Sequence, residues 1–202
     1  MRQLKRTLGP LAILVLIVAL VACGKRVTRQ EVGTVTDLSG KWNDTDSREV
    51  AQAMIDDSLT AFWVNEFRTS HGGKRPTVIA YGVVNRTAEH INTKTFMNDL
   101  ERAFVRSGRV AVVASKEQRE QIRGERADQQ SGFVANPAAI GKELGADFVL
   151  TGELLSIQDR VDDVEVMFYQ ANLELIDVET NQKVWIGDKK IKKLIERSKT
   201  RY

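Results

Sequence analysis

The chain has 202 residues, of which 42% are hydrophobic and 28% are charged. These proportions exclude a disordered polar chain and a collagen-like repeat, and the single cysteine excludes a disulfide scaffold. The formal charge of +3 suggests an affinity for nucleic acid. However, Arg2, Lys5 and Arg6 supply three of the 30 basic residues, within a leader that holds no acidic residue. From Cys23 onward 27 basic residues face 27 acidic ones, so a basic nucleic-acid-binding domain is not indicated.

Residues 1–22 have the pattern of a secretory signal peptide, with a basic start followed by an apolar run of 12 residues over 11–22. The run is shorter than the roughly 20 residues that a membrane span needs. It ends in Leu20-Val21-Ala22-Cys23-Gly24, which resembles a bacterial lipobox. A lone cysteine is otherwise a small buried hydrophobe. We predict a lipoprotein signal peptide over 1–22 and a covalent diacylglycerol and N-acyl chain on Cys23, with no other cofactor.

The mature chain reads as a short tether followed by one domain. We place the tether after the lipidated cysteine at residues 23–33, in a polar stretch that runs from Gly24 into an early strand near Asp37. No Pro-rich or Gly/Ser-rich linker divides the rest, because the chain has only three prolines. Residues 34–202 are therefore predicted to form a single α/β globular domain.

The elements of this domain follow from hydrophobic periodicity and capping signals. The first is an amphipathic helix that extends to about Phe67, with its N-cap within Asp44-Thr45-Asp46-Ser47 and Glu49 as the capping-box partner of Asp46. The other expected elements are a strand over 77–84, a helix from Asn92 or Thr93 to Gly108, a strand over 110–114, a polar helix from Ser115 with Gln118 to about Gln129, a helix from Asn136-Pro137 to Gly145, a strand over 148–155, and a hairpin of 164–177 and 183–195.

Apolar strands that alternate with helices are typical of a parallel sheet. The strand over 77–84 is nearly all apolar, which indicates burial on both faces. We therefore predict an α/β fold with a mixed, mainly parallel sheet that is flanked by helices and closed by an antiparallel hairpin.

No pattern of catalytic or metal-binding residues stands out. His71 and His90 fall in different predicted loops, without a nucleophile or second ligand at suitable spacing. Gly72-Gly73-Lys74 lacks the earlier glycine and the following Ser or Thr of a phosphate loop, and favours a helix-ending turn. Asp162-Asp163-x-Glu165 lacks the ligand spacing and central glycine of a calcium loop. The sequence thus predicts a protein that is not an enzyme and binds no metal.

Two charge patterns remain. Arg119, Arg123 and Arg126 fall on one face of the polar helix, with glutamates interleaved. Such a face is either a surface helix with internal ion pairs or a protein interface, where arginine is favoured. The C-terminal stretch Lys183–Tyr202 carries eight basic residues against two acidic ones, which suits either a solvated end or contact with an anionic partner.

Three segments together resemble one family. They are residues 37–47 (DLSGKWNDTDS), Asn85-Arg86-Thr87 after the first buried strand, and residues 145–150 (GADFVL). They are similar to LpoB-type outer-membrane lipoproteins, which activate a class A penicillin-binding protein, a peptidoglycan synthase. The resemblance spans about Thr34 to Ile186. It implies a fold like the N-terminal domain of TolB, a lipid-anchored position in the outer membrane facing the periplasm, and regulation by contact with that synthase.

The resemblance leaves the docking face and the particular synthase open. Known members carry a long, Pro-rich tether, whereas this tether is short. Our hypothesis for the partner-binding surface is the polar helix and the loop after it: Arg119, Arg123, Arg126, Gln129, Gln130 and Phe133. The alternative function is a structural or secretion-apparatus lipoprotein of the CsgG type. Such proteins add long membrane-spanning hairpins, and Val164–Asp177 alternates only partly.

We expect Cys23→Ala to abolish membrane attachment without unfolding the domain, because the acyl chains are the predicted anchor. Fractionation of cells into soluble and membrane material, with circular dichroism of the purified variant, checks this. Membrane association that persists in the variant would contradict a lipid anchor at Cys23.

Overall fold

The computed structural model describes residues 27–31, 33–138 and 141–197. The chain divides into two compact units, residues 1–34 and 35–202. In the first unit the Thr34 N–H donates to the carbonyl of Glu31 at 3.0 Å. The strand expected near Asp37 is absent from the described residues 27–31 and 33–37. The predicted signal peptide, Cys23 and the end of the basic C-terminal stretch lie outside the described residues.

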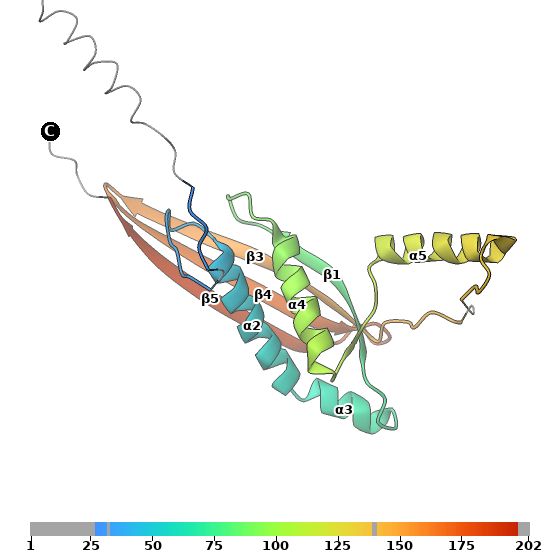
Figure 1. Ribbon diagram of the computed structural model, residues 1–202. Helices are drawn as coiled ribbons and strands as arrows, with labels where there is room; N and C mark the ends of the chain where they lie inside the picture. The colour runs from blue at the N-terminus through green and yellow to red at the C-terminus, as the bar shows by residue number, and fades with distance from the viewer. Residues whose placement is uncertain (1–26, 32, 139–140, 198–202) are drawn as a thin grey trace, which may run out of the picture. The chain divides into compact units, whose positions relative to one another are not determined.

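Five strands form one sheet in the order β2-β1-β3-β4-β5 (Figure 1). β1 pairs in parallel with β2 and β3, whereas β3, β4 and β5 pair antiparallel. The strands are β1 Thr77–Asn85, β2 Ala111–Val112, β3 Phe148–Val161, β4 Val164–Asp177 and β5 Lys183–Glu196. The sheet is mixed, as predicted, but it is not mainly parallel, because β2 has two residues and each antiparallel strand has 14.

The single first helix of the prediction is two helices, α2 Asp44–Thr60 and α3 Trp63–Ser70. The chain leaves helical geometry at Ala61, whose ψ is 159°. The Trp63 side chain holds the break, because its Nε1–H donates to the carbonyl of Ser58 at 2.8 Å. The periodicity of apolar residues continues across both helices, so it could not locate this corner.

The N-cap of α2 is Asn43, one residue before the predicted range, and its capping-box partner is Asp46 rather than Glu49. The Asp46 N–H donates to Asn43 Oδ1 at 3.0 Å, and the Asn43 N–H donates to Asp46 Oδ2 at 2.9 Å. Asparagine caps as well as aspartate does, so the shift costs the helix no cap.

The capping signals of the next two helices are confirmed. Helix α4, Thr93–Ser107, is capped by Asn92 and ends at Gly108, which has a φ of 64°. Helix α5, Lys116–Asp128, begins after Ser115 with Gln118 in its capping box, and continues into the π-helical turn η1, Gln129–Phe133.

The predicted helix from Asn136-Pro137 to Gly145 is wrong for the described part of that stretch. Residues 136–138 and 141–145 have neither helix nor strand. The Gln129 side chain binds the backbone there: the Ala138 N–H donates to Gln129 Oε1 at 2.8 Å and does not start a helical turn. Capping residues and one Pro mark where a helix can begin, but they do not make it pack.

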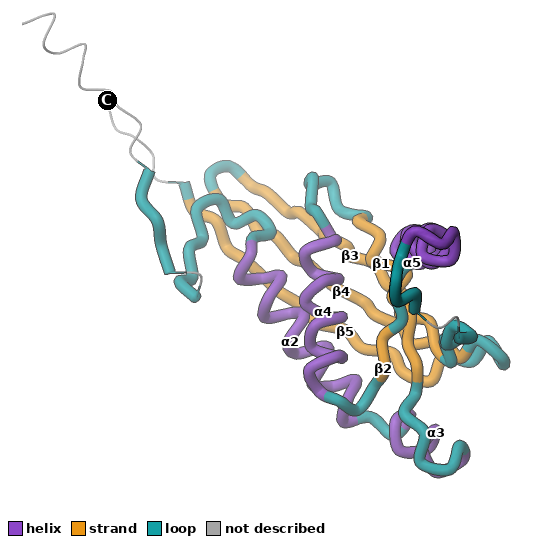
Figure 2. Tube along the Cα trace, turned by 45° about the vertical axis from the view of Figure 1, so that its right-hand side comes forward, coloured by secondary structure: helices purple, strands orange, loops and turns teal. Residues whose placement is uncertain are grey.

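One apolar layer holds the domain together. Helices α2 and α4 lie side by side on one face of the sheet, as Figures 1 and 2 both show. Residues on β4 alternate between buried and half-buried, as a strand with one covered face requires. The layer is completed at the α3 end by Phe148, which meets Trp63 and Phe67 edge to face. Its most deeply buried members include Val50, Val64, Leu100, Phe104, Leu150, Leu173 and Leu175.

The opposite face of the sheet is much less covered, so the predicted two-sided burial of β1 is wrong for its second half. Val78 and Ile79 are buried, but Tyr81 is 72% exposed and Val84 is 51% exposed. The prediction assumed helices on both faces, whereas α2 and α4 cover the same one.

A charged hydrogen-bond network fastens residues 37–47, which we call the motif segment, to the edge strand β5. The Lys193 ammonium donates to Asp37 at 2.6 Å, to Asp46 at 2.7 Å and to the carbonyl of Lys41 at 3.1 Å. Burial alone would lower the pKa of Lys193, but the hydrogen bonds to Asp37 and Asp46 outweigh it and raise that pKa. The bond from Lys193 also lowers the pKa of Asp37.

The motif segment is held at a second point by Trp42. Its backbone N–H donates to Glu89 at 3.3 Å and to the Tyr169 hydroxyl oxygen at 3.1 Å. The Tyr169 hydroxyl in turn donates a short hydrogen bond to Glu89, and burial together with this bond raises the pKa of Tyr169. Gly40 allows the close approach, since it has a φ of 68° and an added Cβ would lie 2.3 Å from Ile195.

Lys193→Met is expected to lower the free energy of unfolding by about 1–3 kcal/mol, because Asp46 would be left largely buried without its cation. Lys189→Met is the matched control, since Lys189 lies on the same strand but is exposed and has no ion pair among the described residues. Urea unfolding of both variants measures the difference. Equal stabilities would contradict a structural role for the network.

The same network predicts a pH window for that difference. Asp37 has a lowered pKa when folded, so its contribution is present above an unfolded pKa of about 3.9 and is lost as the pH falls through the folded value. Lys193 has a raised pKa, so its contribution is present below about 10.4 and is lost as the pH rises through the folded value. The difference in free energy of unfolding between wild type and Lys193→Met should therefore be largest from about pH 5 to 9.

Candidate functional site

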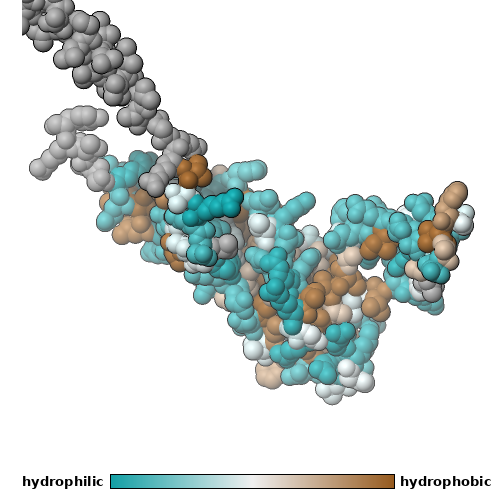
Figure 3. Space-filling view, in the orientation of Figure 1, coloured by the Kyte–Doolittle hydropathy of each residue, from teal (hydrophilic) through white to brown (hydrophobic). Residues whose placement is uncertain are grey.

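The polar helix, its terminal turn and the loop that returns to the sheet form an exposed structure that we call the arm: α5, η1 and residues 134–138 and 141–147. No residue of α5 or η1 is buried. The sequence of α5 explains this, because its one large apolar residue is Ile122, which is 44% exposed. A helix with so little apolar surface gains nothing by packing on the sheet. Figure 3 accordingly shows α5 as largely hydrophilic.

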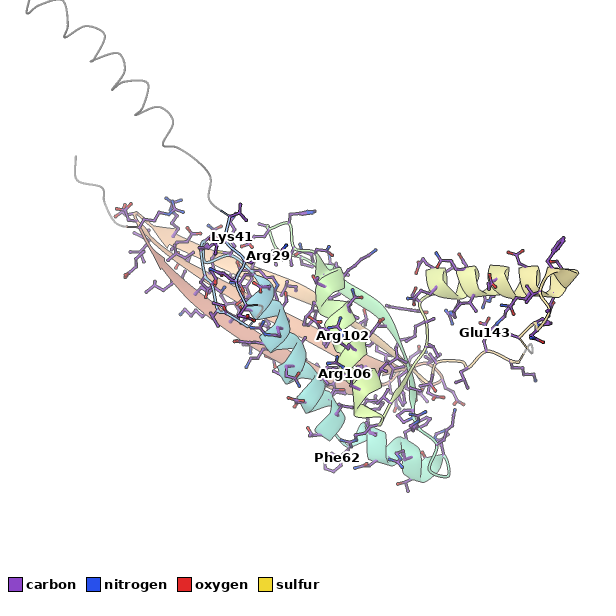
Figure 4. The ribbon with its side chains drawn as sticks, in the orientation of Figure 1. Arg29, Lys41, Phe62, Arg102, Arg106 and Glu143 are labelled. Atoms are coloured by element: carbon purple, nitrogen blue, oxygen red, sulfur yellow. The ribbon has the colours of Figure 1, made fainter. Side chains whose placement is uncertain are left out.

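The root of the arm lies beside a groove of about 560 Å³. Residues of α4, the chain after β2 and Gln118 of α5 line it. Its apolar part includes Val105, which is 61% exposed, and burial raises the pKa of Glu101 at its side. Arg102 and Arg106 also line the groove from α4, where Figure 4 labels both. The root is thus an apolar groove with charged sides.

Three arginines of α5 form what we call the arginine face: Arg119, Arg123 and Arg126. Arg123 donates from Nε and Nη2 to the two carboxylate oxygens of Glu143, at 3.0 and 2.8 Å, and Arg126 donates to the same carboxylate at 3.1 Å. The hydrogen bond from Arg123 lowers the pKa of Glu143, and the carboxylate in turn raises the pKa of Arg123. Figure 4 shows Glu143 on the return loop below α5.

The far end of the arm presents an aromatic side chain. Gly132, with a φ of 91°, turns the chain within η1. Gln129 fixes the following loop, since it donates to Glu125 at 2.9 Å and accepts from the Ala138 N–H at 2.8 Å. Phe133 is left 92% exposed. A large aromatic side chain held in the open is the kind of residue that anchors protein interfaces.

The structure thus places all six residues of the sequence hypothesis on the arm, although their role in binding stays a prediction. Arg123 and Arg126 are engaged with Glu143, and Gln129 with its own loop. Gln130 and Phe133 are exposed. The arginine face thus agrees in part with the interpretation of α5 as a surface helix with ion pairs. Its ion pairs are made to Glu143 of the return loop and not within the helix.

Sequence reasoning missed Glu143, Lys193 and the pair of Glu89 and Tyr169. Glu143 follows Arg126 by 17 residues, and the other contacts join residues 80 or more positions apart. Helical spacing reveals only partners three or four residues apart. A lone glutamate between Lys142 and Leu144 gave no signal that it would meet the arginines.

The other candidates from the sequence lie in packing contacts or turns of the fold. The ring of His71 stacks on Phe67 with 4.0 Å between centroids. Gly72 and Gly73 follow the end of α3, and Asp162 lies in the turn between β3 and β4. Within the described ranges no group of three or more His, Cys, Asp or Glu residues is arranged to hold a metal ion. No helix of the described residues is both long and apolar enough to cross a bilayer.

Comparison with known proteins identifies the family. The peptidoglycan-synthase activator LpoB family matches residues 46–191, which include the arm and most of the sheet. The chain belongs to the LpoB family. A comparison with curated protein sequences found no match.

Several solved structures are similar to the chain at low identity. The C-terminal domain of LpoB from Salmonella enterica is 16% identical, with a TM-score of 0.42, and the match covers 72% of this chain and 98% of that one. The NMR structure of Escherichia coli LpoB is 16% identical, with a TM-score of 0.41, and the match covers 86% and 83%. Lipoprotein GNA1162 from Neisseria meningitidis is 13% identical, with a TM-score of 0.40 over 62% and 88%.

Phe133→Ala should leave the free energy of unfolding within about 0.5 kcal/mol of wild type, because the side chain is exposed. Phe104→Ala, the buried control, should cost about 3–5 kcal/mol by opening a cavity in the apolar layer. Urea denaturation measures both. A large loss of stability in Phe133→Ala would show that this ring packs in the fold and is not available to a partner.

Proposed function

We propose that this protein is a lipid-anchored regulator that binds a class A penicillin-binding protein and activates it from the outer membrane. Its membership of the LpoB family, over residues 46–191, is the observation that carries the proposal. In this proposal the signal peptide is residues 1–22, the acylated residue is Cys23, the tether is residues 23–33, and residues 34–202 are the regulatory domain. A relation of its fold to the N-terminal domain of TolB belongs to the same proposal.

We infer that the docking surface is the arm. It offers what a protein interface needs: an exposed aromatic anchor in Phe133, arginines on one helix face, and an apolar groove at the root. Because α5 is already a formed helix with a capping box, docking its side chains costs little ordering of its backbone. The opposite sheet face also exposes apolar residues but lacks a comparable set of arginines around an aromatic anchor.

Activation follows if the arm binds the active conformation of the synthase more tightly than the inactive one, because a ligand shifts an equilibrium only by its differential affinity. The protein acts by contact and supplies no catalytic group. Eleven tether residues extend to at most about 40 Å, so the start of the domain must lie within that distance of the membrane surface. The alternative, a CsgG-type secretion component, is not favoured by the family match.

We expect the soluble mature protein, residues 24–202, to raise the rate of glycan polymerisation by the class A synthase of the same cell when added in equimolar amount. Incorporation of labelled lipid-linked disaccharide by the detergent-purified synthase measures this rate. No stimulation would contradict the activator function.

Arg123→Glu and Phe133→Ala should each reduce that stimulation several-fold without lowering the thermal midpoint, because they remove a cation and an anchor from the docking surface. Lys189→Glu is the control, since it makes the same charge reversal on an exposed residue of β5. Unchanged stimulation by both arm variants would place the docking surface elsewhere while leaving the activator function intact.

A further inference from the structure

The arginine face is occupied by a carboxylate of the same chain. Glu143 accepts two hydrogen bonds from Arg123 and one from Arg126. This paired geometry is how an arginine fork recognises a carboxylate of any origin. The hydrogen bond from Arg123 lowers the pKa of Glu143, as a carboxylate bound by an arginine fork should show.

The occupant comes from a segment that the fold does not otherwise fix. Residues 141–145, around Glu143, have no helix or strand and are exposed. Two of the three glutamates of α5 have other partners: Glu117 accepts from the Ser115 hydroxyl and Glu125 accepts from Gln129. Glu143 is the carboxylate that hydrogen-bonds the arginine face, and it can leave without the helix unfolding.

The arginines of α5 are gathered on one face, although the helix as a whole carries four basic and four acidic residues. Glu143 pairs with Arg123 and Arg126, Glu120 also acts electrostatically on Arg123, and Arg119 has no ion pair among the described residues. The face therefore attracts a carboxylate through its arginine hydrogen-bond donors and not through an excess of charge. Phe133, at the far end of the arm, adds an apolar anchor.

We infer that Glu143 is an internal substitute for a carboxylate of the protein partner, and that docking exchanges the two on Arg123 and Arg126. This rests on the proposed docking by the arm and specifies its chemistry. The partner surface carries an Asp or Glu side chain for the arginine face and an apolar recess for Phe133. Glu143 then lowers the affinity, because its ion pair must open before the partner binds.

Glu143 alone can control this exchange, because the ion pair that opens and the ion pair that forms are similar in strength. A solvent-exposed ion pair is weak, so opening it changes the binding constant by a small factor, on the order of two- to fivefold. The partner's carboxylate regains the same hydrogen bonds. Glu143 thereby excludes surfaces without a well-placed carboxylate, since these would leave the arginines without a partner.

The test is Glu143→Gln, which keeps the shape of the side chain and removes its charge. We expect residues 24–202 with this substitution to bind the detergent-purified class A synthase two- to fivefold more tightly than wild type. Glu174→Gln, the same change of charge at an ion-paired carboxylate of β4 outside the arm, should change binding by less than twofold. In an Arg123→Gln/Arg126→Gln background, Glu143→Gln should have no effect, because no competition remains.

A second probe tests the exchange without the synthase. A fluorescent hexaglutamate peptide should bind Glu143→Gln more tightly than wild type at low salt and should not bind the double arginine variant. Hydrogen exchange over residues 116–128 verifies that α5 persists in each variant. Equal or weaker binding of both probes by Glu143→Gln would overturn the inference and make Glu143 a structural residue. Tighter peptide binding without any synthase binding would uphold the exchange and contradict the proposed partner.

Discussion

The apolar layer between one face of the sheet and helices α2 and α4 is the constraint on which the rest of the structure depends. Every segment that supplies apolar side chains at the right period is drawn into this layer, from Val50 on α2 to Leu175 on β4. Helix α5 supplies only Ile122 and therefore stays outside it. The arm is exposed, and therefore available to a partner, because α5 lacks the apolar side chains that would pack it on the sheet.

Ion pairs and hydrogen bonds hold the motif segment at one end of the apolar layer. Lys193 draws together Asp37 and Asp46, and Trp42 joins Glu89 and Tyr169. A segment whose residues 37–43 have neither helix nor strand is thereby fixed to the sheet. The first of the three segments that suggested the LpoB family thus has a structural role in the domain. The proposed functional surface lies elsewhere, on elements that the domain leaves exposed.

What the sequence revealed was local. Capping residues located the starts of α4 and α5, and hydrophobic periodicity located β4, because these signals lie within a few residues of one another. The break at Ala61, the one-sided cover of β1 and the absence of a helix in the described residues after Pro137 depend on how distant segments pack. The six arm residues were proposed from helical spacing and arginine content, yet their main partner, Glu143, joins them only through the course of the return loop.

We propose that this LpoB-family protein acts by docking its arm on a class A synthase. Hydrogen exchange of residues 24–202, measured with and without the detergent-purified synthase, is the most direct test of this docking. We expect slower exchange in α5, η1 and the return loop when the synthase is present, with little change in β4 and β5. Protection confined to α2, α4 or the exposed sheet face, with none in the arm, would contradict it.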